Sequence, residues 1–355
     1  MTDDFHKFIF LGAMIVLAVF SNRDSLYRQK AVVADAKQFA QNQTSPLAVS
    51  RVEPPMFVLN PPKKQATAPA YLGEPRAAVS EDAFPPLAEE KKSSSVLQSS
   101  PDAPVTSFKK VGNEDPSNVG ANVVLVADLA SGDEFFSKGP EKRWPIASIT
   151  KLMSAAVVSK ELAFHQSTTL LEADFPLESP GKNLKIEDRY SVADLMLAML
   201  LESSNESAEA LARMYGRENF LSAMNQTAAL WGIPGTHFSD PTGLSPSNQS
   251  TSADLRKLAL TIYGEYPEIF KITKKASARI TELNFGKRLS LTNINLLASR
   301  ADFLGGKTGY IDEAGGNLLS IFSYARRPII IIVLGSDDRF GETEKLLTWF
   351  EKNYR

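Results

Sequence analysis

The sequence predicts an α/β (α+β) fold for residues 119–355, in which helices flank an antiparallel sheet and part of the chain forms an all-helical subdomain. Three observations support this prediction. Strand-like apolar runs lie near both ends of the region, helix start signals with helical apolar spacing fill its middle, and short turn signals join neighbouring strands. Segments far apart in the chain must therefore complete one sheet.

The first strands are predicted at the start of this region. Residues 123–127 are consecutive apolar residues, which is typical of a buried strand. Residues 130–133 favour a turn, and residues 134–137 supply the partner strand of a hairpin. A helix is then expected to begin close to Ser148, just after a proline and a small residue.

Two capping boxes predict helix starts in the middle of the region. Ser191 and Thr251 are each followed three positions later by Asp, and Leu, Met or Ala then repeat at helical spacing. A third helix is predicted over residues 218–231 and should end at Gly232. Strand signals return at residues 317–324 and 329–334, and residues 339–354 predict a closing amphipathic helix.

The composition excludes several classes of function. The chain has 355 residues, 43% of them hydrophobic, and a formal net charge of −2, which argues against a nucleic-acid-binding surface. It has no cysteine, so a disulfide framework, a thiol nucleophile and a cysteine-ligated zinc site are excluded. The three histidines share no metal-ligand spacing. We therefore predict no metal and no cofactor, and nothing supports a histidine-based triad.

An apolar segment at residues 8–20 carries no charge and follows Lys7. As a helix it would reach about 20 Å, short of the roughly 30 Å apolar core of a bilayer unless flanking residues contribute. Residues 1–30 are thus expected to be either a cleaved signal peptide or an uncleaved membrane anchor. We favour the anchor because no Ala-x-Ala cleavage site follows the apolar run.

Residues 31–118 differ in composition from the region that follows. Twelve of the 21 prolines lie between Pro46 and Pro116, among Ser, Ala, Gln and scattered charges. No helical or alternating apolar period is sustained there, so too little apolar surface could be buried to offset the entropy of ordering. We expect a disordered, Pro-rich linker.

Ser148 and Lys151 form a candidate nucleophile and base. Three residues apart on a helix, their side chains project from the same face about one turn apart. A lysine can deprotonate a serine only if burial or nearby positive charge lowers its pKa. A Ser-x-x-Lys tetrad is expected by chance about once or twice in such a chain, and Ser107–Lys110 and Ser179–Lys182 are two such matches.

Two further motifs follow in order. Ser203-Ser204-Asn205 comes after an apolar stretch, where a polar cluster favours a turn between helices. Lys307-Thr308-Gly309 lies in a Gly-rich stretch ahead of a predicted strand, where glycine lets backbone approach a ligand closely. The ordered set of three motifs is much less expected by chance than any one of them.

These motifs resemble those of the penicillin-recognising serine enzymes, and within them the low-molecular-mass D-alanyl-D-alanine carboxypeptidases. The resemblance implies a β-lactamase/transpeptidase-like fold and covers essentially all of residues 119–355. Besides the three motifs, the matching stretches are residues 143–151, 200–211, 238–244, 293–295 and 306–315. Residues 240–243 favour a structural turn rather than a catalytic element.

The resemblance also implies a role for each motif residue. Ser148 would attack a D-Ala-D-Ala peptide carbonyl and become acylated, with Lys151 as proton acceptor. Ser203 and Asn205 would relay a proton to the leaving D-alanine and hold the substrate amide. The substrate-binding residues would be Lys307, Thr308, Gly309 and Tyr310, with the terminal carboxylate on the first two. The backbone N–H groups of Ser148 and Tyr310 would form the oxyanion hole.

The implied function is the trimming of peptidoglycan stem pentapeptides by a serine D-Ala-D-Ala carboxypeptidase, with β-lactam antibiotics as acylating inhibitors. A D,D-endopeptidase of peptidoglycan cross-links, or a penicillin-binding sensor that does not turn over, remains an alternative. A class A β-lactamase is disfavoured because Ser204 replaces its Asp and no Glu-x-x-Leu-Asn follows Asn205. The expected location is the cell envelope, on the outer face of the cytoplasmic membrane, with residues 8–20 in the membrane.

Overall fold

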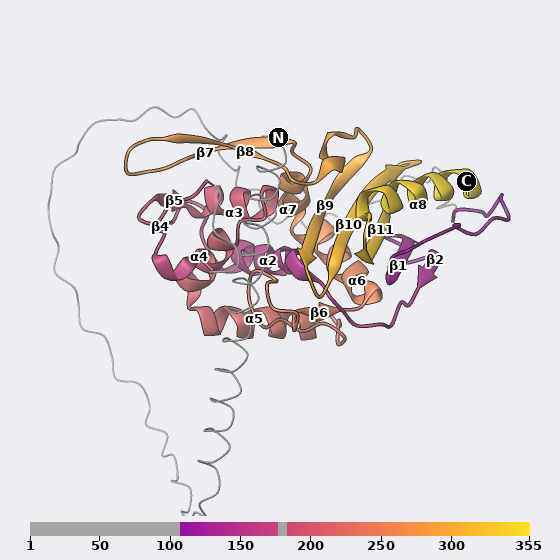
Figure 1. The fold of residues 1–355 in the computed structure, drawn as a ribbon, viewed down its shortest axis with the longest axis horizontal. Helices are drawn as coiled ribbons and strands as arrows, with labels where there is room; N and C mark the ends of the chain where they lie inside the picture. The colour runs from indigo at the N-terminus through magenta and orange to yellow at the C-terminus, as the bar shows by residue number, and fades with distance from the viewer. Residues whose placement is uncertain (1–106, 177–182) are drawn as a thin grey trace, which may run out of the picture. The chain divides into compact units, whose positions relative to one another are not determined.

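A five-stranded antiparallel sheet joins the two ends of the part of the chain that the structure describes. The structure is a computed structural model that describes residues 107–176 and 183–355. The strand order is β2-β1-β11-β10-β9 (Figure 1). The strands are β1 (Val123–Asp128), β2 (Glu134–Lys138), β9 (Phe303–Ile311), β10 (Gly315–Tyr324) and β11 (Arg327–Ser336). The predicted pairing of distant segments is confirmed, because β1 lies antiparallel to β11.

Local sequence explains the central strands. Every residue of β1 is buried, and so are residues 329–334 of β11, which is why both segments are uninterrupted apolar runs. The hairpin of β10 and β11 turns at Ala325 and Arg326, whose φ angles are 48° and 64°. Two consecutive positive φ angles match the twist of a two-residue hairpin loop.

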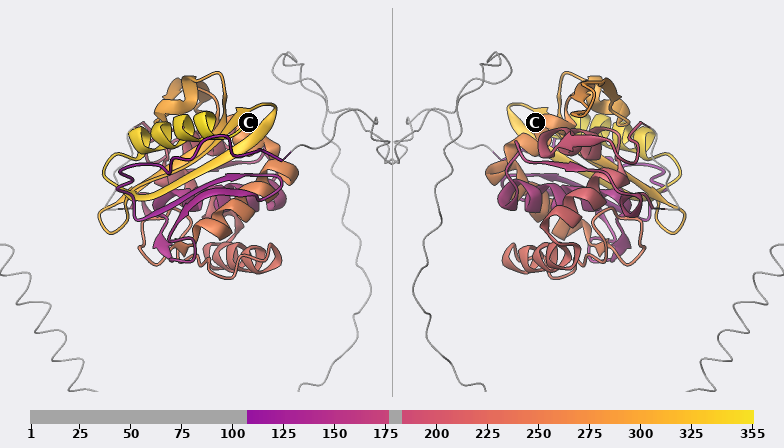
Figure 2. Two further views of the ribbon diagram at one scale, coloured as in Figure 1. Left: turned by 90° about the vertical axis from the view of Figure 1, so that its right-hand side faces the viewer. Right: turned by 90° about the vertical axis from the view of Figure 1, so that its left-hand side faces the viewer.

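Helices cover both faces of this sheet (Figure 2). Helix α8 (Arg339–Asn353) packs on β10 and β11, and the other helices lie on the opposite face. The helices of that face are α2 (Lys151–Glu161), α3 (Val192–Leu201), α4 (Asn205–Tyr215), α5 (Arg217–Leu230), α6 (Ser252–Glu265) and α7 (Pro267–Thr273). The predicted fold class is confirmed, and the helical subdomain also contains short strand pairs.

The predicted helix caps are present. The Ser191 side chain accepts a hydrogen bond from the backbone N–H of Asp194, and Thr251 does the same for Asp254. These bonds satisfy N–H groups that have no partner within the helix. Helices α3 and α6 therefore begin where the capping boxes predict.

Short elements connect the helices. The two-stranded pairs are β3 (Trp144–Pro145) with β6 (Gln249–Ser250), β4 (Ser167–Thr169) with β5 (Arg189–Ser191), and β7 (Ser277–Thr281) with β8 (Arg288–Thr292). The 3₁₀ turns are η1 (Ala147–Thr150), η2 (Glu172–Asp174) and η3 (Leu296–Ser299). The sequence did not predict β7 and β8, because each buries only one of its five residues.

Residues 107–118, the end of the predicted linker, contact α8 and the chain end. Phe108 lies edge-on to Phe350 with ring centroids 5.3 Å apart. The backbone N–H of Lys109 donates to Arg355 O at 2.7 Å, and Trp349 Nε1 donates to Glu114 O at 2.7 Å. The packed part of the chain thus begins ahead of Val119.

The other N-terminal predictions lie outside the described residues. These are the anchor or signal segment at residues 1–30, the linker up to residue 106, and the Ser-x-x-Lys match at residues 179–182. Within residues 107–176 and 183–355, no helix combines the length and apolar character that crossing a bilayer requires.

Candidate active site

Ser148 lies at the start of α2, as predicted, but in a 3₁₀ turn rather than in the α-helix itself. Turn η1 contains Ser148, and Lys151 is the first residue of α2. Residues three apart eclipse each other in a 3₁₀ turn, which brings the two side chains together. The preceding Ala147 has φ 48°, a left-handed conformation that costs an alanine free energy.

Lys151 is a buried amine with three close oxygen neighbours. It is fully buried, and its Nζ lies 2.9 Å from Ser148 Oγ, 2.6 Å from Asn205 Oδ1 and 2.6 Å from Thr242 O. Burial lowers the pKa of Lys151 to about 7, although the carboxylate of Asp240 acts in the opposite direction. Much of the amine is therefore neutral near pH 7, as a general base requires.

The turn that begins at Asp240 contacts Lys151 through a backbone carbonyl. The carboxylate of Asp240 accepts hydrogen bonds from the N–H groups of Thr242 at 2.7 Å and Gly243 at 2.6 Å, which fixes the turn. Gly243 has φ 85°, and a Cβ there would collide with the carbonyl of Ala147. The prediction of a structural turn is confirmed, and the carbonyl oxygen of Thr242 in this turn also contacts the Lys151 amine.

Ser203-Ser204-Asn205 connects α3 to α4, as predicted. Ser204 caps α4 by accepting a hydrogen bond from the backbone N–H of Ser207. Ser203 has φ 61°, so the chain turns sharply there. Asn205 is the first residue of α4, and its amide oxygen contacts Lys151. The turn and the helix cap thus bring the side chains of Ser203 and Asn205 close to the first motif, Ser148 and Lys151.

Lys307, Thr308 and Gly309 lie ahead of β10, the predicted strand, and they also lie inside the edge strand β9, which the sequence did not predict. Lys307 is 2% exposed, and its Nζ donates to Ser203 Oγ at 2.9 Å. Burial, followed by repulsion from Lys151, holds the pKa of Lys307 well below its usual value. The third motif therefore contacts the second directly.

Gly309 lets β9 approach the nucleophile. A Cβ on Gly309 would lie 2.8 Å from Ile146 O and 3.1 Å from Ser148 N, which leaves no room for a larger residue. Tyr310 follows with its side chain 62% exposed, and its hydroxyl donates to Asp312 Oδ1 at 3.2 Å. The backbone N–H of Ser148 thus lies beside the strand that the substrate would meet.

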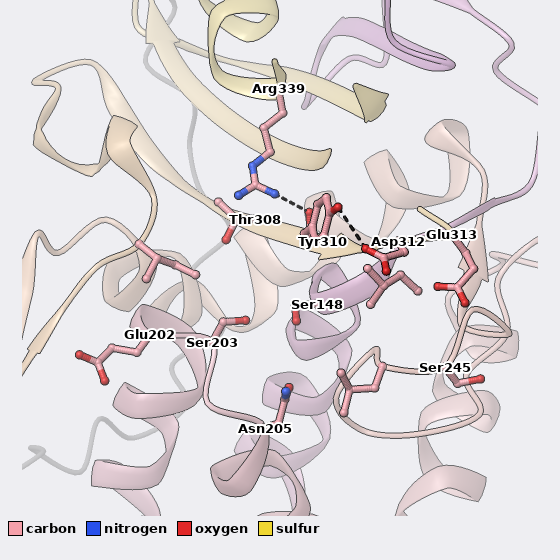
Figure 3. A pocket seen from close by; sticks show the side chains of 14 residues that line it. Ser148, Glu202, Ser203, Asn205, Ser245, Thr308, Tyr310, Asp312, Glu313 and Arg339 are labelled. Atoms are coloured by element: carbon pink, nitrogen blue, oxygen red, sulfur yellow. Dashed lines mark hydrogen bonds between the residues drawn. The ribbon is translucent and has the colours of Figure 1, made fainter. Parts of the chain in front are cut away.

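One cleft contains the nucleophile and most of the predicted residues (Figure 3). Its volume is about 710 Å³. Its lining residues are Ser148, Glu202, Ser203, Asn205, Leu244, Ser245, Ile294, Thr308, Gly309, Tyr310, Ile311, Asp312, Glu313 and Arg339. Lys151 and Lys307 lie just behind the wall and contact Ser148 and Ser203 through their amines. All eight residues predicted from the sequence are at this one place.

Arg339 is a cleft residue that the sequence analysis missed. Its Nη1 donates to Gly309 O at 2.7 Å, and its side chain points into the cleft (Figure 3). Burial lowers the pKa of Arg339, and no carboxylate among the described residues pairs with it. The sequence did contain a signal for Arg339. It is the first residue of the closing helix, where a cation is unfavourable because it opposes the helix dipole.

The groups in the cleft fit acyl transfer. The described residues contain no group of three or more His, Cys, Asp or Glu side chains that could hold a metal ion. A hydroxyl beside a neutral amine supplies a nucleophile and its base. Arg339, which pairs with no carboxylate among the described residues, supplies positive charge for an anionic ligand group. The fold and site thus define a serine hydrolase.

Comparison with known proteins gives the family. The family model of the D-alanyl-D-alanine carboxypeptidases (peptidase family S11) matches residues 109–338. This chain belongs to that family, which confirms the resemblance drawn from the three motifs. The curated relatives include both D-alanyl-D-alanine endopeptidases and D-alanyl-D-alanine carboxypeptidases.

Individual relatives agree in fold and sequence. The chain is 30% identical over 242 residues to the D-alanyl-D-alanine endopeptidase of Escherichia coli K12, covering 66% of this chain and 78% of that protein. The crystal structure of a D-alanyl-D-alanine carboxypeptidase from Mycobacterium tuberculosis H37Rv is 26% identical, with a TM-score of 0.63 over 69% and 96% of the two chains. Penicillin-binding protein D2 of Listeria monocytogenes in its cefotaxime-bound form is 29% identical, with a TM-score of 0.57 over 66% and 98%.

Proposed function

We propose that this protein is a serine carboxypeptidase that removes the terminal D-alanine from peptidoglycan stem pentapeptides through an acyl-enzyme. The observation that carries the proposal is the buried Lys151 amine, 2.9 Å from Ser148 Oγ and with a pKa of about 7. A serine next to such an amine is activated for attack on a peptide carbonyl. Family membership supplies the substrate class.

The contacts of Lys151 orient its lone pair. As a neutral amine it has two N–H groups, and the two acceptors at 2.6 Å, Asn205 Oδ1 and Thr242 O, occupy both. The lone pair then faces the third neighbour, Ser148 Oγ, and accepts its proton as the oxygen attacks. The proton moves to Lys151, and a bond forms between Ser148 Oγ and the carbonyl carbon.

The cleft offers groups for the next steps. The backbone N–H groups of Ser148 and Tyr310 stabilise the oxyanion that forms on the carbonyl oxygen. Ser203, held at 2.9 Å by the Lys307 amine, passes a proton to the nitrogen of the leaving D-alanine and takes up in exchange the proton that Lys151 accepted, which returns the Lys151 amine to its neutral form. The C–N bond breaks, an ester remains on Ser148, and water then hydrolyses it.

The substrate carboxylate binds at the cationic end of the cleft. Thr308 and Arg339 line that part of the wall (Figure 3), and the Lys307 amine lies behind it. The guanidinium has no carboxylate partner among the described residues, so binding an anion offsets the cost of its burial. A β-lactam also carries a carboxylate beside its reactive carbonyl, and we propose that it acylates Ser148 in the same position.

The test compares three peptides with the full chain. We expect free D-alanine to be released from a peptide ending in D-Ala-D-Ala, and little cleavage of a cross-linked stem-peptide dimer. When the terminal carboxylate is amidated, kcat/KM should fall about 10- to 100-fold, because charge-assisted hydrogen bonds to the carboxylate are lost. Chromatography of the released amino acid and peptide products measures all three rates.

Two other outcomes would change the assignment. Preferential cleavage of the dimer would make the protein a D,D-endopeptidase, a candidate favoured by its likeness to the Escherichia coli enzyme of that name. Acylation by a fluorescent penicillin without cleavage of either substrate would make it a penicillin-binding sensor. Equal rates on the free and amidated peptides would contradict the carboxylate site at Thr308 and Arg339.

We further propose that residues 8–20 anchor the protein at the outer face of the cytoplasmic membrane. The support is their uncharged apolar sequence and an extracytoplasmic substrate class. The full chain should then remain with the membrane fraction after an alkaline wash. Complete release into the soluble fraction, with a shortened N-terminus by mass spectrometry, would instead establish a cleaved signal peptide.

A further inference from the structure

The β7–β8 hairpin is a cationic arm beside the cleft. Its two strands pair over five residues each, and Figure 1 shows them together at one side of the helical subdomain. The exposed charged side chains of residues 274–292 are all cations, namely Lys274, Lys275, Arg279, Lys287 and Arg288. No ion pair to them is present among the described residues. The one acidic residue of the segment, Glu282, is buried.

Glu282 anchors the arm instead of neutralising its surface. Its carboxylate accepts hydrogen bonds from the backbone N–H groups of Arg189 at 3.1 Å, Asn284 at 2.7 Å and Phe285 at 2.8 Å. The backbone N–H of Leu283 also donates to Arg189 O at 2.8 Å. The tip is thereby held against β5 before any ligand binds, which lowers the entropy lost on binding.

The tip exposes apolar side chains. Phe285 is 90% exposed and Leu283 is 48% exposed, next to Ile186 at 48%. An aromatic ring left in water at a rigid turn contributes nothing to the core and is a common anchor for a partner. The adjoining loop is balanced in charge, since its two cations, Lys185 and Arg189, are matched in number by Glu187 and Asp188, so the excess positive charge belongs to the arm.

The base of the arm borders the cleft. The backbone N–H of Thr292, the last residue of β8, donates to Glu202 Oε1 at 3.1 Å, and that of Ile294 donates to Leu201 O at 3.1 Å. Glu202 and Ile294 both line the cleft. Five residues of antiparallel strand span about 17 Å, so the arm extends the cleft by several sugar or peptide units.

We propose that the β7–β8 arm binds the peptidoglycan polymer outside the cleft while a stem peptide occupies the cleft. This inference rests on the proposed function. Peptidoglycan is a chain of amino sugars with short peptides that carry free carboxylates. The cations of the arm pair with those carboxylates, and the Phe285 ring packs on the apolar face of a sugar. The arm adjoins the edge of the cleft, and a polymer whose stem peptide occupies the cleft must pass over that edge. This arrangement favours peptidoglycan over a lipid bilayer as the partner of the arm.

The experiment uses full-length variants on a short and a polymeric substrate. One variant combines Lys287→Gln with Arg288→Gln, and a second is Phe285→Ser. A matched control combines Lys345→Gln with Lys352→Gln, which removes the same charge from exposed positions of α8. We expect D-alanine release from insoluble peptidoglycan to fall about five- to tenfold in the two arm variants and not in the control. Release from a short D-Ala-D-Ala peptide should be the same in all four proteins.

Co-sedimentation with insoluble peptidoglycan gives a second readout that needs no catalysis. The wild type should sediment, and the double arm variant should remain in solution, with the difference shrinking at high salt. If the wild type cleaves neither substrate, the proposed function fails, and the sedimentation result still decides the role of the arm.

Three results would overturn the proposal. The first is an unchanged rate and unchanged sedimentation of the arm variants on the polymer. The second is an equal loss on the short peptide, which would place the arm in catalysis. The third is a loss of binding only to vesicles containing phosphatidylglycerol, which would assign the arm to the membrane surface.

Discussion

Replacing Ser148 by Ala is expected to abolish acylation by penicillin and reduce D-alanine release by at least about 10⁴-fold. The hydroxyl is the side-chain group that bonds to the substrate carbon in the proposed mechanism, and loss of a catalytic serine removes the whole acylation route. Fluorescence of the labelled band on a gel measures acylation, and D-alanine release measures turnover.

A matched serine supplies the control for this variant. Ser159→Ala changes the same residue type on α2, at a partly exposed position away from the cleft, and should retain full labelling. Both variants should melt at close to the wild-type temperature, because Ser148 Oγ makes only one short hydrogen bond. Persistent labelling of a folded Ser148→Ala protein would exclude Ser148 as the nucleophile.

Replacing Lys151 by Met should slow acylation by about 10³-fold and remove its dependence on pH. In the wild type only the neutral amine accepts the proton, and the pKa of Lys151 is about 7. The acylation rate should therefore rise as the pH increases through about 7, level off about one unit higher, and fall about tenfold for each unit below. Stopped-flow acylation by a chromogenic β-lactam between about pH 5 and about pH 9 measures this profile.

Stability must be measured separately for Lys151→Met. The change leaves Asn205 Oδ1 without its Lys151 donor and Thr242 O with the more distant Ser148 hydroxyl at 3.4 Å, which costs about 1–3 kcal/mol of unfolding free energy, while it removes the cost of burying an amine. A cooperative melt would show that slow acylation reflects the missing base. A variant that keeps the wild-type profile would show that another group takes the serine proton.

Local features of this fold were predictable because their causes lie within a few residues. The strand at residues 123–127, the caps at Ser191 and Thr251 and the turn at residues 130–133 depend on apolar runs, capping hydroxyls and turn residues, each read from neighbouring positions. The β7–β8 hairpin escaped prediction because each strand buries a single residue, which leaves almost no periodic signal.

Other parts of the site depend on contacts between distant residues. Lys151 meets Asn205 across 54 positions of sequence, and Lys307 meets Ser203 across 104. The carbonyl of Thr242 and the guanidinium of Arg339 enter the site only because a turn and the start of α8 pack against it. Arg339 belongs to no matching stretch, and Thr242 lies in residues 240–243, for which only a structural turn was predicted, so neither residue was expected at the site.

The sequence by itself determined which chemical groups are available, namely a serine, two lysines and an amide in three ordered motifs, and it also determined the family resemblance that they carry. Only the tertiary structure decided that the first lysine is fully buried and its pKa lowered to about 7. The reason is that a pKa responds to the water and charge around a group, and those surroundings come from segments that the chain brings together only when it folds.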